Sequence, residues 1–208
     1  MNTLDIFRSF ANILRKRMED ASRKDEPLSE DTVCFYIAAA YVQAGRDAQT
    51  IEMEVPHPAL RKPKGMQKAV DILVYRGEEL VWIEVKFDRE PPSGASMNET
   101  NRFGKLLNDM LRAAIIPQGE RLVIYLTTAT MDSYLRNNQP HFQQSRPFVI
   151  DRAFLDRLPP SALSQVEGGV IERIPPGGVS ATLLAVEGID SLKCFLYGVN
   201  SNPLVTTF

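Results

Sequence analysis

The spacing of apolar residues predicts three long helices. Near the N-terminus apolar residues recur every three or four positions, which is typical of an amphipathic helix over residues 3–23. Ser29 is a good N-cap and Gly45 a good stop, so a second helix is expected from about Glu30 to Gln43. A third pattern runs from about residue 98 to 115, with its inward positions at Phe103, Leu106, Leu107, Met110 and Leu111.

Between and after these helices the pattern favours strands. Residues 50–55 alternate, and residues 69–75 and 80–87 are two β-type runs joined by a very short connection. Residues 121–127 are nearly all apolar, as in a strand covered on both faces. A short helix is expected over residues 131–138 and a last core strand over residues 147–151.

The C-terminal part has a different pattern. Residues 153–166 predict one or two short helices interrupted by Pro159 and Pro160, and residues 179–186 and 193–199 predict an antiparallel pair. We therefore predict a single α/β domain over residues 1–208, with a central mixed β-sheet flanked by helices on both faces. An N-terminal helix within residues 1–27 precedes a core over residues 28–150, and a C-terminal β extension occupies residues 151–208.

Composition narrows the class of protein. The chain has 208 residues, 44% apolar and 24% charged, which is ordinary for a globular protein. No run of 18 uncharged apolar residues exists, so no membrane span is expected, and the N-terminus lacks the apolar core of a secretory signal. Cys34 and Cys194 are too few for a disulfide framework and are expected to be reduced and buried. With only His57 and His141 beside them no zinc cluster is expected, and the predicted location is the cytoplasm.

The connection between the two β-type runs predicts how they pair. If Gly77 and Glu78 form a two-residue type II′ turn, residue 76 lies opposite 79 and Asp71 lies opposite Glu84. Directly opposed side chains have Cβ atoms about 5 Å apart, where two carboxylates repel unless a cation or a shared proton holds them. A divalent metal with oxygen ligands is the simplest explanation. Lys86 follows on the same face, roughly 6.6–7 Å further along the strand.

These residues carry a resemblance to a known superfamily. A helix with an early acid (Glu30), an Asp on one strand (Asp71) and Glu-x-Lys on the next (Glu84 and Lys86) resembles the PD-(D/E)XK nucleases over residues 28–150. The resemblance implies a restriction-endonuclease-like fold in which Asp71, Glu84 and Glu30 bind Mg²⁺ or Mn²⁺. It also implies that Lys86 supports the attacking water. Val70 stands where the superfamily often has proline.

The function expected from this resemblance is a metal-dependent nuclease that hydrolyses phosphodiester bonds, in DNA rather than RNA. The alternative is a catalytically inactive module of the same fold that binds nucleic acid or a protein partner. A homodimer is suggested by analogy alone, because cutting both strands of a duplex often uses two sites, and the C-terminal strands could supply its interface.

Basic residues near this site have two interpretations. The segment 56–68 carries four cations and no acid, which suits either a solvated loop or contact with phosphate: Arg61, Lys62, Lys64 and Lys68. On the third helix Lys105, Asn108, Asp109 and Arg112 are best explained as an outward polar stripe. The functional alternative is that Lys105 or Arg112 reaches the substrate phosphate.

Other residues have mainly structural interpretations. An acid at Glu30 is favoured by the helix dipole even without a ligand. Glu52 and Glu54 are expected to face solvent, and Trp82 is expected to pack beneath a helix. His57, between two prolines, is expected to be a structural loop residue.

Overall fold

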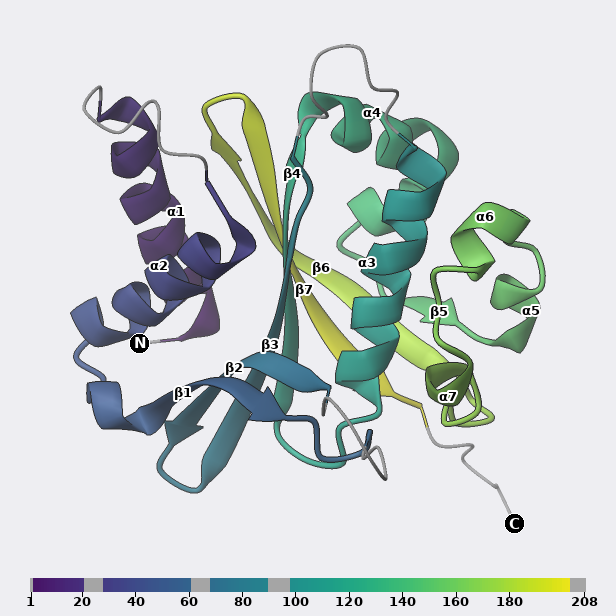
Figure 1. Ribbon diagram of the computed structural model, residues 1–208, viewed down its shortest axis with the longest axis horizontal. Coiled ribbons are helices and arrows are strands. Elements are labelled where there is room, and N and C mark those ends of the chain that lie inside the picture. Colours follow the sequence, from purple (N-terminus) through teal and green to yellow (C-terminus); the bar gives the residue numbers. More distant parts are fainter. Residues whose placement is uncertain (1, 21–27, 61–67, 90–97, 203–208) are drawn as a thin grey trace.

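The computed structural model describes residues 2–20, 28–60, 68–89 and 98–202. Across them the strands join in one mixed sheet in the order β1-β2-β3-β4-β7-β6-β5, with helices on both faces (Figure 1). The strands are β1 (Ile51–Pro56), β2 (Ala69–Arg76), β3 (Glu79–Phe87), β4 (Glu120–Thr128), β5 (Phe148–Ile150), β6 (Val179–Ile189) and β7 (Leu192–Ser201). The longer helices are α1 (Thr3–Glu19), α2 (Glu30–Gln43), α3 (Glu99–Ala114) and α4 (Ala129–Asn138). The short ones are η2 (Ala48–Thr50), η3 (Pro140–Gln143), α5 (Arg152–Leu155), α6 (Pro160–Leu163) and α7 (Gly168–Ile171).

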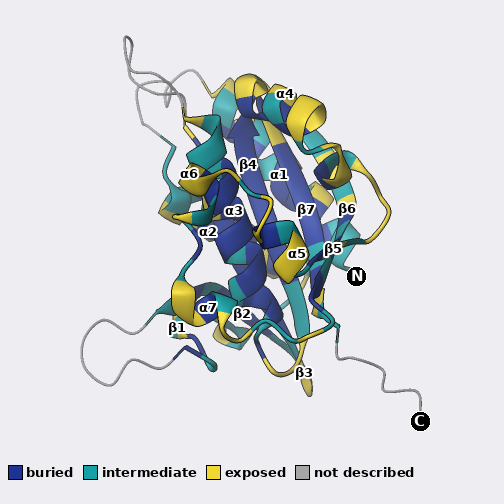
Figure 2. Ribbon diagram, turned by 90° about the vertical axis from the view of Figure 1, so that its right-hand side faces the viewer, coloured by how far each residue is buried: buried dark blue, intermediate teal, exposed yellow. Residues whose placement is uncertain are grey.

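Two apolar cores lie on opposite faces of the sheet. Helices α1 and α2 cover one face, where residues such as Phe10 and Ile37 pack against Ile83 of β3. Helix α3 covers the other face, and Phe103 and Met110 lie in the second core. Figure 2 shows α3, β4 and β7 as the most continuously buried elements. Side chains that alternate along β3 therefore enter different surroundings: those of Val81, Ile83 and Val85 face α1 and α2, whereas Trp82 and Glu84 face α3.

The local predictions for helices and central strands are confirmed. Helix α2 begins at Glu30 with Ser29 as its N-cap, whose side chain accepts from the Thr32 N–H, and it ends just before Gly45. The expected inward residues of α3 are all buried. Strand β4 runs parallel to β3, antiparallel to β7, and is buried on both faces. In the N-terminal part α1 ends at Glu19, earlier than the predicted residue 23.

The C-terminal strands complete the central sheet. The predicted antiparallel pair is present as β6 and β7, and β7 pairs with β4 in the middle of the sheet. The prediction of a core strand at residues 147–151 is wrong, because β5 has only three residues and lies at the sheet edge beside β6. Its central residue, Val149, is 47% exposed. An apolar tripeptide fits an edge as well as a core, and the pairing partner decides between them.

One further expectation, about the two cysteines, is confirmed. Cys34 and Cys194 are buried free thiols. In the described part of the chain no helix is both long and apolar enough to cross a membrane.

Candidate functional site

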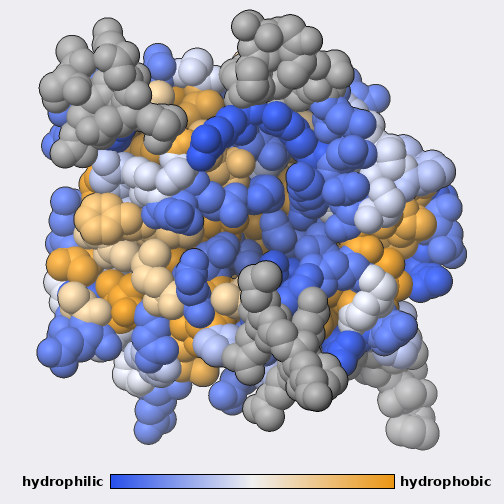
Figure 3. Space-filling model, in the orientation of Figure 1, coloured by the Kyte–Doolittle hydropathy of each residue, from blue (hydrophilic) through white to orange (hydrophobic). Residues whose placement is uncertain are grey.

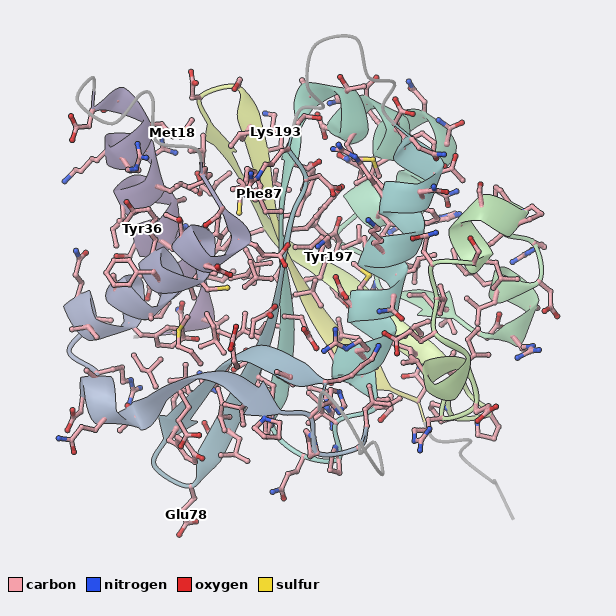
Figure 4. The ribbon with its side chains drawn as sticks, in the orientation of Figure 1. Met18, Tyr36, Glu78, Phe87, Lys193 and Tyr197 are labelled. Atoms are coloured by element: carbon pink, nitrogen blue, oxygen red, sulfur yellow. The ribbon has the colours of Figure 1, made fainter. Side chains whose placement is uncertain are left out.

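The β2–β3 hairpin has the predicted register. Gly77 has φ +67°, as the first residue of a type II′ turn requires, and Arg76 pairs with Glu79. The regular pairing continues to Ile72 and Ile83, and the predicted pair of Asp71 and Glu84, the next step, is not part of the ladder. Figure 4 marks the two ends of this unit, with Glu78 at the tip of the hairpin and Phe87 at the far end of β3.

Beyond Ile83, carboxylates take the place of the neighbouring strand. The backbone N–H of Val85 donates to Asp71 Oδ2 at 2.6 Å, and the N–H of Phe87 donates to Glu30 Oε2 at 3.0 Å. Buried N–H groups at a strand edge need a partner, and here two side chains from different elements supply it. The acids of β2 and of the first turn of α2 thus meet along one edge of β3.

Glu30 also binds Lys86. The Nζ of Lys86 donates to Glu30 Oε2 at 2.8 Å, and the lysine side chain is only 18% exposed. Burial by itself lowers the pKa of Lys86, but the carboxylates of Asp109 and Glu30 outweigh this effect, so that its pKa is raised. Lys86 is therefore a cation at neutral pH, able to donate hydrogen bonds and unable to accept a proton.

Helix α3 places an arginine against Glu84. Arg112 Nη2 is 3.3 Å from Glu84 Oε1, and Arg112 Nη1 is 3.8 Å from Asp109 Oδ1. The same guanidinium donates to the carbonyl of Ala69 at the start of β2. Glu84 is only 2% exposed, and its Oε1 has no hydrogen-bond partner among the described residues. A buried carboxylate oxygen without a donor is costly, and in a polar cluster it is a natural position for a cation.

The expectation of an outward stripe on α3 is wrong for three of its four residues. Asp109 and Arg112 each have a side chain only 14% exposed, and Asn108 is buried and accepts from the Glu167 N–H. Lys105 is exposed, as expected. The reason for Asp109 and Arg112 is that β3 carries the charged partners Lys86 and Glu84 on this face, whereas Asn108 is buried by its bond to the loop before α7.

The carboxyl groups have raised pKa values. Burial raises the pKa of Asp71 to about 6, although the hydrogen bond from Val85 opposes the shift. Burial raises the pKa of Asp109 to about 7, against the attraction of Lys86 and Arg112. The pKa of Glu84 is well above its usual value, again through burial, with Arg112 opposing and Asp109 and Asp71 adding to the shift. A positive charge bound nearby would favour the deprotonated form of these carboxyl groups and lower their pKa values.

A pocket of about 190 Å³ opens on the α2 side of Asp71. Glu30, Asp31, Glu54 and Asp71 contribute its carboxylates. Glu54 lies opposite Asp71 in the β1–β2 register and has φ +51°, a conformation that costs energy in a non-glycine residue. It is exposed, as expected, yet it belongs to the wall of this pocket.

The cluster fits a divalent cation in donor type and charge. Four carboxylates (Glu30, Asp71, Glu84 and Asp109) face two cations, Lys86 and Arg112, and one oxygen of Glu84 lacks a donor. Hard cations prefer such oxygen ligands. As the side chains are placed, however, no three His, Cys, Asp or Glu residues of the described ranges form a ready metal cage.

The remaining residues predicted from the sequence have separate outcomes. Arg61, Lys62 and Lys64 lie outside the described residues, and Lys68 forms an ion pair with Glu167. His57 is structural: its Nδ1 accepts from the Ala59 N–H, and its Nε2 is 3.0 Å from the Arg112 carbonyl oxygen. Trp82 is buried beside Ile116 and donates to the Gln118 carbonyl at 3.0 Å, so it packs beneath the connection between α3 and β4.

The sequence reasoning missed one acid of the network. Asp88 is buried just beyond β3 and accepts a hydrogen bond from the Tyr125 hydroxyl. Burial raises the pKa of Asp88, and the cations of Arg102, Lys86 and Lys105 partly offset the effect. The alternation Glu84-x-Lys86-x-Asp88 was the available signal, because residues two apart on a strand share a face.

Comparison of the chain with protein-family models, with curated proteins and with solved structures found no match. The α/β class with a mixed sheet flanked by helices is what the structure shows. The resemblance to PD-(D/E)XK nucleases stays a prediction that depends on the residues of the hairpin and α2.

Proposed function

We propose that this chain is a divalent-metal-dependent nuclease that hydrolyses phosphodiester bonds, in DNA rather than RNA. The observation that carries the proposal is the convergence of Glu30 on Lys86, next to Asp71 and Glu84. A hairpin with alternating charges is common by itself. It is much less common for a separate helix to place a further acid at the same end of the strand.

The proposed roles follow from charge and position. Asp71 and Glu84 would hold Mg²⁺ or Mn²⁺, with Glu30 as an auxiliary ligand. Such an ion lowers the pKa of a bound water and polarises the phosphoryl oxygen. Lys86, kept as an ammonium by Glu30 and Asp109, donates hydrogen bonds to the attacking water or to phosphate oxygens and neutralises their charge. Arg112 holds the carboxylate of Glu84 in place from the α3 side.

Contact with nucleic acid is proposed along the polar surface between α2 and α3. Figure 3 shows a strongly hydrophilic region there, bordered by apolar surface over α2. Lys105 is the predicted contact residue best placed for a phosphate, because it is exposed on α3 and lies close enough to Asp88 to influence its charge. We also expect the protein to work in the cytoplasm, in keeping with two buried, reduced cysteines.

A different observation favours the second candidate, an inactive module of the same fold. Each principal carboxylate already has a partner within the chain: Glu84 has Arg112, Asp71 has the Val85 N–H, and Glu30 has Lys86. A network of this kind could serve stability alone, with a nucleic acid or protein bound elsewhere.

Cleavage assays separate the two candidates. Duplex and single-stranded DNA and RNA are incubated with wild-type protein and Mg²⁺, Mn²⁺ or a chelator, and then with Glu84→Gln and Lys86→Met. We expect metal-dependent cleavage of DNA that falls by about 100-fold or more in both variants, as for loss of a metal ligand or a charge-stabilising group. Glu79→Gln, at the exposed start of the same strand, is the matched control and should keep full activity.

A binding measurement makes the test independent of turnover. Mg²⁺ or Mn²⁺ should raise the melting temperature of the wild type and leave that of Asp71→Ala unchanged. If the wild type neither cleaves any substrate nor responds to either ion, the metal-dependent nuclease is ruled out and the binding module is favoured.

A further inference from the structure

Helix α3 presents one stripe of charged residues to strand β3. Four charged residues follow one another at spacings of three, four and three, so they lie along one side of the helix: Arg102, Lys105, Asp109 and Arg112. The helix connects the parallel strands β3 and β4, and it runs back beside β3 in the opposite direction (Figure 1). The end of α3 therefore lies near the middle of β3, and its first turns lie near the end of that strand.

In the last turns of α3 each charge of the stripe has an opposite charge on β3. Arg112 Nη2 lies 3.3 Å from Glu84 Oε1. One turn earlier the carboxylate of Asp109 attracts the ammonium of Lys86, and this attraction raises the pKa of the lysine. Because these charges match one to one, this part of the stripe is electrically balanced against the strand.

In the first turns of α3 the charges do not balance. Asp88 continues β3, because its N–H donates to the Leu126 carbonyl of β4 at 2.9 Å, and its buried carboxylate accepts a hydrogen bond from the Tyr125 hydroxyl. Two cations of α3, Arg102 and Lys105, act on this one carboxylate and oppose the rise of its pKa. Within the described ranges neither of them forms an ion pair. This end of the stripe therefore has one positive charge in excess.

Arg102 also has an unused hydrogen-bond donor. The residue is partly exposed, but its Nη1 atom is buried and has no hydrogen-bond partner in the part of the chain that the structure describes. A guanidinium nitrogen removed from water without an acceptor is costly, and an anionic oxygen is the partner that best offsets this cost. The excess charge and the unused donor both point to an anionic ligand at this end of α3.

We propose that Arg102, supported by Lys105, binds a backbone phosphate of the nucleic acid next to the phosphate that Lys86 contacts. This inference rests on the proposed nuclease function, which places the scissile phosphate at Lys86. Asp88, which the two cations flank, lies two residues beyond Lys86 on the same side of the strand, so the two anion-binding positions follow one another along one row. A nucleic-acid strand carries phosphates at regular intervals and can occupy both positions, whereas a small anion would occupy only one. The planar fork of an arginine suits such a contact, because it can donate to two phosphate oxygens at once.

The test is the binding of a fluorescent DNA oligonucleotide to the full chain, measured by anisotropy in the presence of a chelator at several salt concentrations. Without a divalent ion the proposed cleavage does not take place, so binding is measured separately from turnover. We expect the dissociation constant to rise by about tenfold in Arg102→Gln, and the slope of log Kd against log salt to fall by roughly 0.7–0.9, as for the loss of one phosphate contact. Arg102→Lys keeps the charge and should keep the slope.

The matched control is an arginine on the opposite face of the sheet. Arg8 of α1 has a side chain 65% exposed, and Arg8→Gln should bind the oligonucleotide like the wild type. Melting curves check that each variant is folded.

A neutral linkage locates the contact on the nucleic acid. One phosphate at a time is replaced by an uncharged methylphosphonate, and each oligonucleotide is measured with the wild type and with Arg102→Gln. At one linkage the wild type should lose about tenfold in affinity while the variant loses little, because its contact is already absent. A merely structural role of Arg102 would instead weaken the binding of every oligonucleotide alike.

The inference is overturned if the wild type binds no oligonucleotide, if Arg102→Gln binds like the wild type, or if its loss depends neither on salt nor on the position of the neutral linkage. Failure of the nuclease proposal gives a different result. Binding that depends on Arg102 in a protein that cleaves nothing with Mg²⁺ or Mn²⁺ would reject the nuclease and keep the phosphate site, and cleavage without any dependence on Arg102 would do the reverse.

Discussion

The two halves of strand β3 are held in different ways. From Glu79 to Ile83 the strand pairs with β2 through the backbone, and its inward side chains, Val81 and Ile83, are packed in an apolar core. From Glu84 to Phe87 regular pairing with β2 ends, and carboxylates from β2 and α2 bind the free N–H groups. Both halves pair with β4 and bury apolar side chains such as Ile83 and Val85, and only in the second half do charged hydrogen bonds replace the backbone pairing with β2.

This difference indicates that the second half of β3 is the part of the strand where buried charge lowers the stability of the fold. Removing apolar side chains from water stabilises the fold. Removing carboxylates from water costs hydration free energy, and their hydrogen-bond and charge partners offset only part of that cost. The raised pKa of Asp71, about 6, is the sign of that loss. Clusters of this type are common at functional sites because they favour an incoming ligand of opposite charge.

The largest effect is expected in the first half of β3. Ile83→Ala removes a side chain that is 1% exposed, and we expect the free energy of unfolding to fall by about 2–5 kcal/mol. Chemical denaturation measures this loss, and Ile83→Val should cost roughly 0.5–1.5 kcal/mol. A loss well below about 2 kcal/mol for Ile83→Ala would show that apolar packing contributes less to the first half of β3 than described.

A change of opposite sign is expected in the second half. Asp71→Asn keeps an oxygen that can accept from the Val85 N–H. It removes a carboxyl group whose pKa is raised from 3.8 to about 6. Between these two pH values the folded state binds more protons than the unfolded state, so the wild type loses stability as pH rises through this window. Without added metal the variant should exceed the wild type by about 1–3 kcal/mol at pH 8 and match it near pH 4.

The control for this prediction is an exposed acid. Asp156 has a side chain 64% exposed, and Asp156→Asn should change stability little at either pH. If Asp71→Asn is less stable than the wild type at pH 8, the Asp71 carboxylate contributes net stability and the comparison fails.

A smaller effect concerns cation binding and pH. A divalent ion binds the deprotonated carboxylates, and Asp71 with a pKa of about 6 is mostly protonated at pH 5. We expect the dissociation constant for Mn²⁺, measured by calorimetry, to be about tenfold higher at pH 5 than at pH 8 from this group alone. Equal affinity at both pH values would mean that Asp71 is not a ligand.

Much of the local structure could be predicted from the chain itself. Ser29 and Gly45 bound α2, and Gly77 in a two-residue turn determines the β2–β3 register, which runs from the pair Arg76–Glu79 to the pair Ile72–Ile83. The alternation along β3 correctly separated the Trp82 face from the Ile83 face. These features depend on residues near one another in sequence, whose backbone preferences and side-chain spacing act over a few positions.

Other parts of the site depended on contacts between distant segments. The pattern of α3 could not show that Asp109 and Arg112 turn toward Glu84, because the charged partners that make this favourable lie some 25 residues away on β3. The edge position of β5 and the place of β7 beside β4 were likewise decided by pairing.

The sequence alone determined which residues carry charge along the hairpin and which side of each strand they occupy. Only the tertiary structure decided that β2 leaves β3 at Ile83, that Glu30 and Asp71 bind the N–H groups exposed there, and that Arg112 covers Glu84. The physical reason is that a buried charge or N–H group takes whichever partner the packing of separate elements brings within reach.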